Sequence, residues 1–86
     1  MDRAAEMEIF VHAVEEGSFS AAARTMRLSP SAVSKYISRL EDRLGARLLM
    51  RTTRQLSLTE EGRAFYERAR TILNEIGEAE EVVTQL

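Results

Sequence analysis

The chain has 86 residues, of which 44% are hydrophobic and 30% are charged, and its net charge is −2. This length suits one small domain, and the lack of cysteine excludes disulfides and thiolate metal sites. No apolar run approaches membrane-spanning length and no signal peptide opens the chain, so a cytoplasmic protein is expected.

The charge is unevenly distributed along the chain. Residues 24–54 carry eight basic and two acidic side chains, a net charge of +6, whereas residues 1–23 and 55–86 each carry −4. A basic middle between acidic ends is typical of a protein with one surface that faces a polyanion. An ordinary mixed surface is the alternative that charge alone leaves open.

The first two predicted helices are short and amphipathic. Residues 4–15 place apolar side chains at helical spacing, and Gly17 can end this helix in the left-handed conformation. Ser18 is a predicted N-cap for a second helix over residues 19–26, whose alanines allow another helix to approach closely. A tight turn follows, with Leu28 filling the core.

The sharpest local signal is Ser29-Pro30, an N-cap followed by a proline at the first helical position. It predicts a third helix over residues 30–44 that ends at Gly45. The aliphatic side of this helix is predicted to face the core and consists of Val33, Ile37, Leu40 and Leu44. The opposite side carries Ser31, Lys35, Ser38 and Asp42, flanked by Ser34 and Arg39. One face is therefore apolar and the other carries short hydroxyls and cations.

The periodicity changes after Gly45. Leu48 and Met50 alternate with Arg47, Leu49 and Arg51, and Leu56 and Leu58 alternate with Gln55 and Ser57. Such alternation predicts a short β-hairpin. Its tip, residues 52–54, is polar and basic.

A long last helix is predicted from about residue 60 to the end, capped by Thr59. Its apolar residues form an unbroken heptad seam: Phe65, Ala69, Ile72, Ile76, Ala79, Val83 and Leu86. Phe65 can pack on the core, but the distal part of the seam needs another chain to cover it. We therefore expect a homodimer interface along this seam, with a solvent-exposed connecting helix as the alternative.

Together these elements predict a mainly α fold. We expect a winged helix-turn-helix of three helices and a short β-hairpin wing over residues 1–58, which binds DNA, and a linker and dimerisation helix over residues 59–86. The third helix is expected to enter the major groove of double-stranded DNA, and the wing to lie on the minor groove or the phosphates.

The predicted DNA-binding residues lie near helix starts, along the third helix and in the hairpin. They are Ser18, Ser20, Ser29, Pro30, Ser31, Ser34, Lys35, Ser38, Arg39, Arg51, Thr52, Thr53 and Arg54. Short serines let the backbone approach the bases, Lys35 can reach a guanine edge or a phosphate, and Arg39 is placed to meet the backbone. A solvated polar helix face is the alternative.

No catalytic pattern is present. His12 is the only histidine and is predicted to be a surface residue, and no Ser/His/Asp group, phosphate-binding glycine loop or metal-spaced cluster occurs. We expect no enzymatic activity, cofactor, metal or bound small molecule. The competing function is a protein-interaction module, in which the heptad helix recruits another protein and the basic patch is incidental.

Four stretches in one register resemble the LysR-type family of bacterial transcription regulators. They are GSFSAAA at 17–23, SPSAVSK at 29–35, LEDRLG at 40–45 and RLLMRTTRQLSLTEEG at 47–62. The resemblance implies a dimeric or tetrameric regulator with paired linker helices, which binds imperfect inverted repeats in DNA. It also implies an effector-sensing domain after the linker helix, so the chain resembles an isolated DNA-binding fragment.

The resemblance also assigns roles by position. Ser34 and Lys35 match the family's Ser-Arg pair that contacts bases and phosphates, with lysine in place of arginine. Pro30-Ser31 stands where many members have Gln-Pro, so the base contact of that glutamine is absent. Arg51 and Arg54 match the basic positions of the wing.

Overall fold

The computed structural model describes residues 2–51 and 55–86. For Arg51 it describes the backbone only. The described residues form four helices and one antiparallel strand pair. The elements are α1 (Arg3–Glu16), α2 (Phe19–Met26), α3 (Pro30–Leu44), β1 (Leu49–Arg51), β2 (Leu56–Leu58) and α4 (Glu60–Thr84). This confirms the predicted mainly α fold with a short hairpin and a long last helix. None of the helices in the described ranges is long and apolar enough to cross a membrane.

Local chemistry sets the helix ends. The N-terminal caps are Asp2, Ser18, Ser29 and Thr59, each of which accepts a hydrogen bond from a backbone N–H three residues later. Gly17 and Gly45 end α1 and α3 with φ angles of 77° and 69°, the left-handed region that suits glycine. Arg27 adopts the same region at the end of α2, which makes the tight turn before α3. The predicted caps and stops are therefore confirmed.

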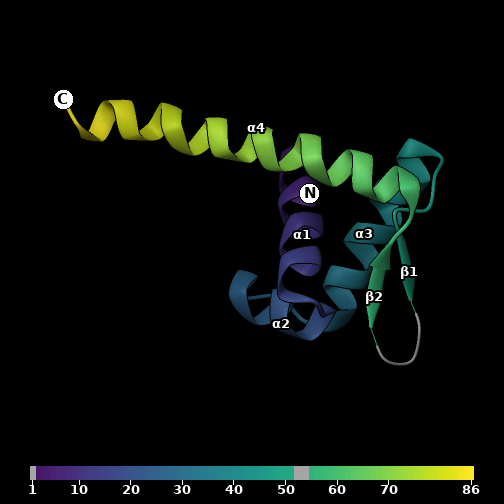
Figure 1. Cartoon of the computed structure of the whole chain (residues 1–86). Coiled ribbons are helices and arrows are strands. Elements are labelled where there is room, and N and C mark those ends of the chain that lie inside the picture. The colour runs from purple at the N-terminus through teal and green to yellow at the C-terminus, as the bar shows by residue number, and fades with distance from the viewer. Residues whose placement is uncertain (1, 52–54) are drawn as a thin grey trace.

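Helices α1, α2 and α3 surround one core, and the first part of α4 lies across it (Figure 1). The buried apolar residues are Ile9, Phe10, Val11, Ala13, Ala22, Ala23, Val33, Ile37, Leu40, Leu48, Leu49 and Ala69. The rings of Phe10 and Phe65 lie 5.5 Å apart between centroids, which joins α1 to α4. Each large apolar side chain buried here contributes about 1.5–3 kcal/mol.

Leu44 does not join this core, contrary to the prediction from the helical wheel. Its side chain is 45% exposed in the last turn of α3. The reason is that α1, α3 and α4 leave an open groove at this end of the molecule, and Leu44 lines it together with Met7 and Ile72.

The hairpin alternates one residue out of step with the prediction. Leu48 and Leu49 are both buried, whereas Met50 is 51% exposed. The cause is that strand pairing begins at Leu49, opposite Leu58, and Leu48 still belongs to the connection from α3. The N–H groups of Leu48 and Leu49 both donate to the Glu41 carboxylate, so regular alternation starts only after them.

Helix α4 is longer than the body that it covers, and its C-terminal part extends past α1 into solvent (Figure 1). The chain is accordingly elongated, with extents of 48 × 25 × 22 Å. The exposed large apolar residues of this helix are Ile72, Ile76, Val82 and Val83, and Leu86 is exposed just beyond its end.

Candidate nucleic-acid interface

The polar face of α3 is open to solvent. Lys35, Ser38 and Arg39 are exposed, and Ser34 is half-buried beside them. On the opposite side of the helix, Val33, Ile37 and Leu40 have no exposed surface. The buried side therefore anchors α3 and the polar side faces outward, as predicted.

The start of α3 adds hydroxyls to this face. Pro30 and Ser31 are exposed, and the hydroxyls of Ser29 and Ser31 lie 3.1 Å apart. Ser29 also caps α3 by accepting from the N–H of Ala32, in the same way as Ser18 caps α2. Ser20 is exposed in the first turn of α2. The structure thus explains Ser18 and Ser29 by capping, and their contact with DNA stays a prediction.

The cations of the basic middle do not all point to one surface. The guanidinium of Arg39 lies 5.7 Å from the centre of the Tyr36 ring, a cation–π distance. Arg43 instead pairs with Glu6, which is only 4% exposed. The net charge of the segment therefore overstates the charge on the α3 face, because Glu6 from α1 neutralises one of its cations.

Strands β1 and β2 lie beside α3 and extend from the start of α4 toward the side on which α2 lies (Figure 1). Their register pairs Met50 with Ser57 and Arg51 with Leu56. The predicted wing residues Thr52, Thr53 and Arg54 lie outside the described residues. The backbone of Arg51 leads directly to them.

Glu41 is the residue of this region that the sequence analysis did not single out. It is 7% exposed, and its carboxylate accepts hydrogen bonds from the backbone of Leu48 and Leu49. A signal for it was available in the sequence. Glu41 follows Ile37 by four residues, so it lies on the aliphatic side of α3, where an acid needs a partner.

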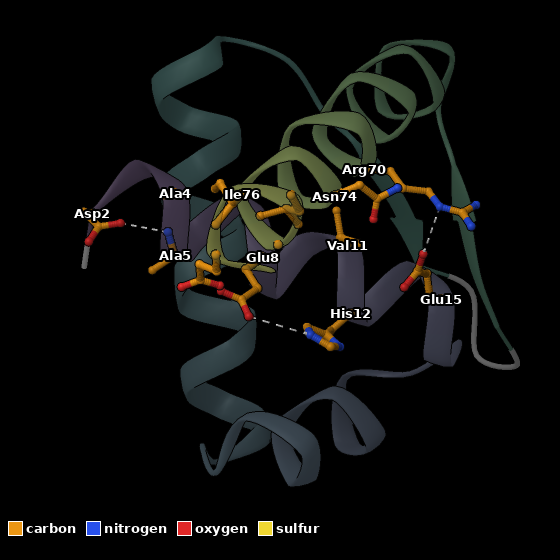
Figure 2. A pocket seen from close by; sticks show the side chains of 13 residues that line it. Asp2, Ala4, Ala5, Glu8, Val11, His12, Glu15, Arg70, Asn74 and Ile76 are labelled. Carbon is orange, nitrogen blue, oxygen red and sulfur yellow. Dashed lines mark hydrogen bonds and ion pairs between the residues drawn. The ribbon is translucent and has the colours of Figure 1, made fainter. Parts of the chain in front are cut away.

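The groove between α1 and α4 has a different character (Figure 2). Four acids line it: Asp2, Glu8, Glu15 and Glu80. Arg70 also lines it, with its Nε 3.8 Å from the Glu15 carboxylate. This acidic surface is unsuited to a polyanion.

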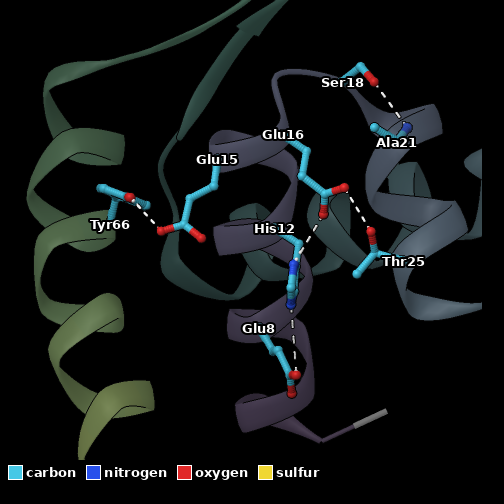
Figure 3. Close-up of polar contacts among 8 residues, drawn as sticks. All are labelled: Glu8, His12, Glu15, Glu16, Ser18, Ala21, Thr25 and Tyr66. Carbon is cyan, nitrogen blue, oxygen red and sulfur yellow. Dashed lines mark hydrogen bonds and ion pairs between the residues drawn. The ribbon is translucent and has the colours of Figure 1, made fainter.

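A row of polar contacts holds α1 to its neighbours (Figure 3). The His12 ring lies 3.2 Å from Glu16 and 4.0 Å from Glu8, so this surface histidine sits between two carboxylates. The Thr25 hydroxyl donates to Glu16 at 2.7 Å, which links α1 to α2. None of the His, Cys, Asp and Glu side chains in the described ranges form a group that could hold a metal ion.

The Tyr66 hydroxyl links α4 to α1 by donating a hydrogen bond to Glu15 at 2.8 Å (Figure 3). This hydrogen bond raises the pKa of Tyr66 above its usual value, because ionisation would remove the donated proton. Partial burial and the negative charge of Glu15 raise the pKa further, and Arg70 acts in the opposite direction.

The predicted dimer seam divides into two parts. Ala69 has no exposed surface and Phe65 packs on Phe10, so these two positions belong to the core of this chain. Ala69 is therefore not available to a partner, which corrects its assignment, whereas Phe65 is half-buried and also lines the open groove beside Ile72. The part of the seam still open to solvent consists of Ile72, Ile76, Ala79, Val83 and Leu86.

Comparison with known proteins places the chain in a family. The model of the bacterial regulatory helix-turn-helix proteins of the lysR family matches residues 4–63. The transcriptional regulator CrgA of Neisseria meningitidis serogroup C (strain 8013) is 55% identical over 75 residues, which are 87% of this chain and 25% of CrgA. The chain therefore belongs to the lysR family. It spans about a quarter of the length of the curated relatives that it matches.

Solved structures show the same architecture. The BenM DNA-binding domain, in complex with catB site 1 DNA, gives a TM-score of 0.90 at 32% identity, over 99% of this chain and 94% of that chain. A structure of CrgA from N. meningitidis gives a TM-score of 0.82 at 48% identity, over 100% of this chain and 29% of that chain. The fold is therefore the predicted winged helix-turn-helix followed by a long helix.

Proposed function

We propose that this chain is the DNA-binding part of a transcription regulator and binds a specific double-stranded site. The observation that carries the proposal is the division of α3 into a fully buried aliphatic side and an exposed side of hydroxyls and cations. An outward polar helix after a tight turn suits the major groove. The BenM DNA-binding domain has the same fold and is in complex with DNA, which supports DNA as the ligand.

Each part of the surface has a proposed role. Ser31, Ser34, Lys35 and Ser38 would face base edges, and Arg39 the phosphates. Ser18, Ser20, Ser29 and Pro30 would approach the backbone at the starts of α2 and α3. Arg51, Thr52, Thr53 and Arg54 of the hairpin would lie on the minor groove or the phosphates. A lysine at position 35 presents a point charge in place of the planar fork with which an arginine makes its paired guanine contact.

We further propose that the chain acts as a homodimer in the cytoplasm. The open part of the α4 seam leaves Ile76 46% and Val83 70% exposed, and burying such side chains gains about 1.5–3 kcal/mol each. A two-fold dimer presents two copies of α3, which matches an inverted-repeat operator.

Titration of duplex DNA with the chain, at low and at moderate salt, tests the function. Affinity should fall steeply as salt rises, because each phosphate contact releases counterions. Lys35→Ala and Arg54→Ala should both weaken binding. Arg68→Ala is the matched control, because it removes one exposed cation from α4.

Two results would contradict the proposal. If random and promoter duplexes both fail to bind at low salt, the chain is an interaction module instead. If Lys35→Ala and Arg68→Ala have equal effects, then α3 is not the recognition surface.

A further inference from the structure

The end of α3 and the start of the hairpin are joined by one buried carboxylate. Oε2 of Glu41 accepts hydrogen bonds from the N–H of Leu48 at 2.8 Å and of Leu49 at 3.2 Å. The backbone carbonyl of Glu41 accepts from Gly45 at 2.8 Å and from Ala46 at 3.2 Å. One residue thus ends the helix and orients the chain that follows it.

The backbone of Arg47 and Leu48 is also hydrogen-bonded to Thr59, the N-cap of α4. The carbonyl of Leu48 accepts a hydrogen bond from the N–H of Thr59 at 3.0 Å. The Thr59 hydroxyl donates to the carbonyl of Arg47 at 2.6 Å and accepts from the N–H of Gly62 at 2.9 Å. Leu48 is therefore the point at which α3, the hairpin and α4 meet.

The Glu41 carboxylate sets the angle between α3 and the hairpin. Residues 45–48 form neither helix nor strand, so no regular ladder sets the angle between α3 and β1. The buried side chains of Leu48 and Leu49 hold the hairpin on the core, but apolar packing is non-directional. Hydrogen bonds depend steeply on angle, and bonds to a charged acceptor are stronger than neutral ones.

We propose that Glu41 is a positioning residue for DNA binding, in that its carboxylate holds the hairpin at the angle that lets the hairpin and α3 engage one duplex together. The proposal rests on the proposed function. Its consequence is selective: without the carboxylate, the hairpin loses its contribution to binding and α3 keeps its own.

Three substitutions separate this role from general stability. Glu41→Met has a side chain of similar length but no oxygen acceptor. Glu41→Asp keeps the charge on a shorter side chain. Glu41→Gln keeps an oxygen that can accept both hydrogen bonds. Hydrogen exchange of the Leu48 and Leu49 amides should be at least about tenfold faster in the Met variant than in the Gln variant. Exchange within α3, at Ile37 and Leu40, should match the wild-type chain. Equal exchange at Leu48 in all variants would overturn the proposal without any DNA measurement.

The second measurement is a double-mutant cycle on duplex DNA. In the wild-type and Glu41→Gln backgrounds, Arg51→Ala and Lys35→Ala should each weaken binding. In the Glu41→Met background, Arg51→Ala should change affinity by less than about twofold, while Lys35→Ala keeps its full effect. If Glu41→Met does not fold, Glu41→Asp serves in its place.

The possible outcomes are distinct. An equal effect of Arg51→Ala in every background would overturn the positioning role. Loss of both effects together would show that Glu41 supports only the fold. If the wild-type chain does not bind DNA, the proposed function fails, while the exchange data still report on the hydrogen bonds of Glu41.

Discussion

The two halves of α4 carry one continuous apolar pattern but meet different surroundings. In the first half, Ala69 is fully buried and Phe65 packs on Phe10 of α1. In the second half, Ile76 is 46% exposed and Val83 is 70% exposed. A heptad pattern therefore shows which side of a helix is apolar, and the rest of the fold decides what covers that side.

Two glycines mark the same contrast. A Cβ atom built on Gly62 would lie 1.9 Å from the carbonyl oxygen of Leu48, so the start of α4 touches backbone there. A Cβ on Gly77 would meet nothing within 4 Å. The first glycine is required by a close approach, and the second leaves α4 open on that side.

The largest effect is expected for Gly62→Ala. The added methyl group collides with backbone that cannot rotate away, so α4 must shift off the hairpin base. We expect the free energy of unfolding to fall by about 3 kcal/mol or more, measured by urea denaturation. That is a large fraction of the stability of a small domain.

The matched control is Gly77→Ala at the other glycine of this helix. An alanine there should stabilise the chain by up to about 1 kcal/mol, since glycine is a poor helix former. If both variants lose stability equally, the close approach of Gly62 to the Leu48 backbone does not distinguish the two halves of α4.

The next largest effect is expected for Ile76→Glu in the open half. Two buried isoleucines are lost per dimer, so the dimer dissociation constant should rise about 100-fold or more in sedimentation experiments. The monomer should remain folded, because Ile76 is already 46% exposed within one chain. Glu78→Ala, outside the seam, should leave the dimer intact.

An unchanged dimer in Ile76→Glu would show that the open seam is not the interface. Unfolding of the monomer would show instead that the second half of α4 is needed by the chain's own core.

The smallest effect concerns Tyr66, which ties the first half of α4 to Glu15 of α1. The pKa of Tyr66 is raised in the fold, so the stability from its hydrogen bond is fully present below the usual tyrosine pKa of about 10. It is lost as the pH rises through the higher pKa of the folded state. Tyr66→Phe should therefore cost about 0.5 kcal/mol near pH 8 and progressively less above about pH 10.

Urea denaturation at several pH values measures this difference, and Glu15→Gln serves as the control. Because the Gln variant removes the negative charge beside the phenol, the effect of Tyr66→Phe should depend less on pH in that background. A cost of Tyr66→Phe that grows with pH would contradict the assigned direction of the pKa shift.

The sequence alone was sufficient wherever a feature depends on residues close in the chain. Ser29, Pro30 and Gly45 set the two ends of α3 through caps and a left-handed stop, and these ends were predicted correctly. The buried and exposed sides of α3 were predicted from the spacing of residues such as Ile37 and Lys35. Such features need only the helical repeat and local hydrogen bonds.

Features that depend on two distant segments were predicted incorrectly or not at all. Leu44 was expected in the core, but the arrangement of α1 and α4 leaves it in an open groove. Arg43 was counted only in the +6 of residues 24–54, and the fold shows that it pairs with the buried Glu6. Ala69 was assigned to the dimer seam because it fits the heptad spacing, but its side chain is buried in the core of its own chain.

The amino-acid sequence by itself thus determined the order of the elements, the N-caps of α2, α3 and α4, the outward face of α3 and the family. Only the tertiary structure decided which apolar surface stays open, which charges are neutralised, and how Glu41 orients the hairpin. The physical reason is range: capping and periodicity act within a few residues, whereas burial and buried hydrogen bonds depend on segments that only folding brings together.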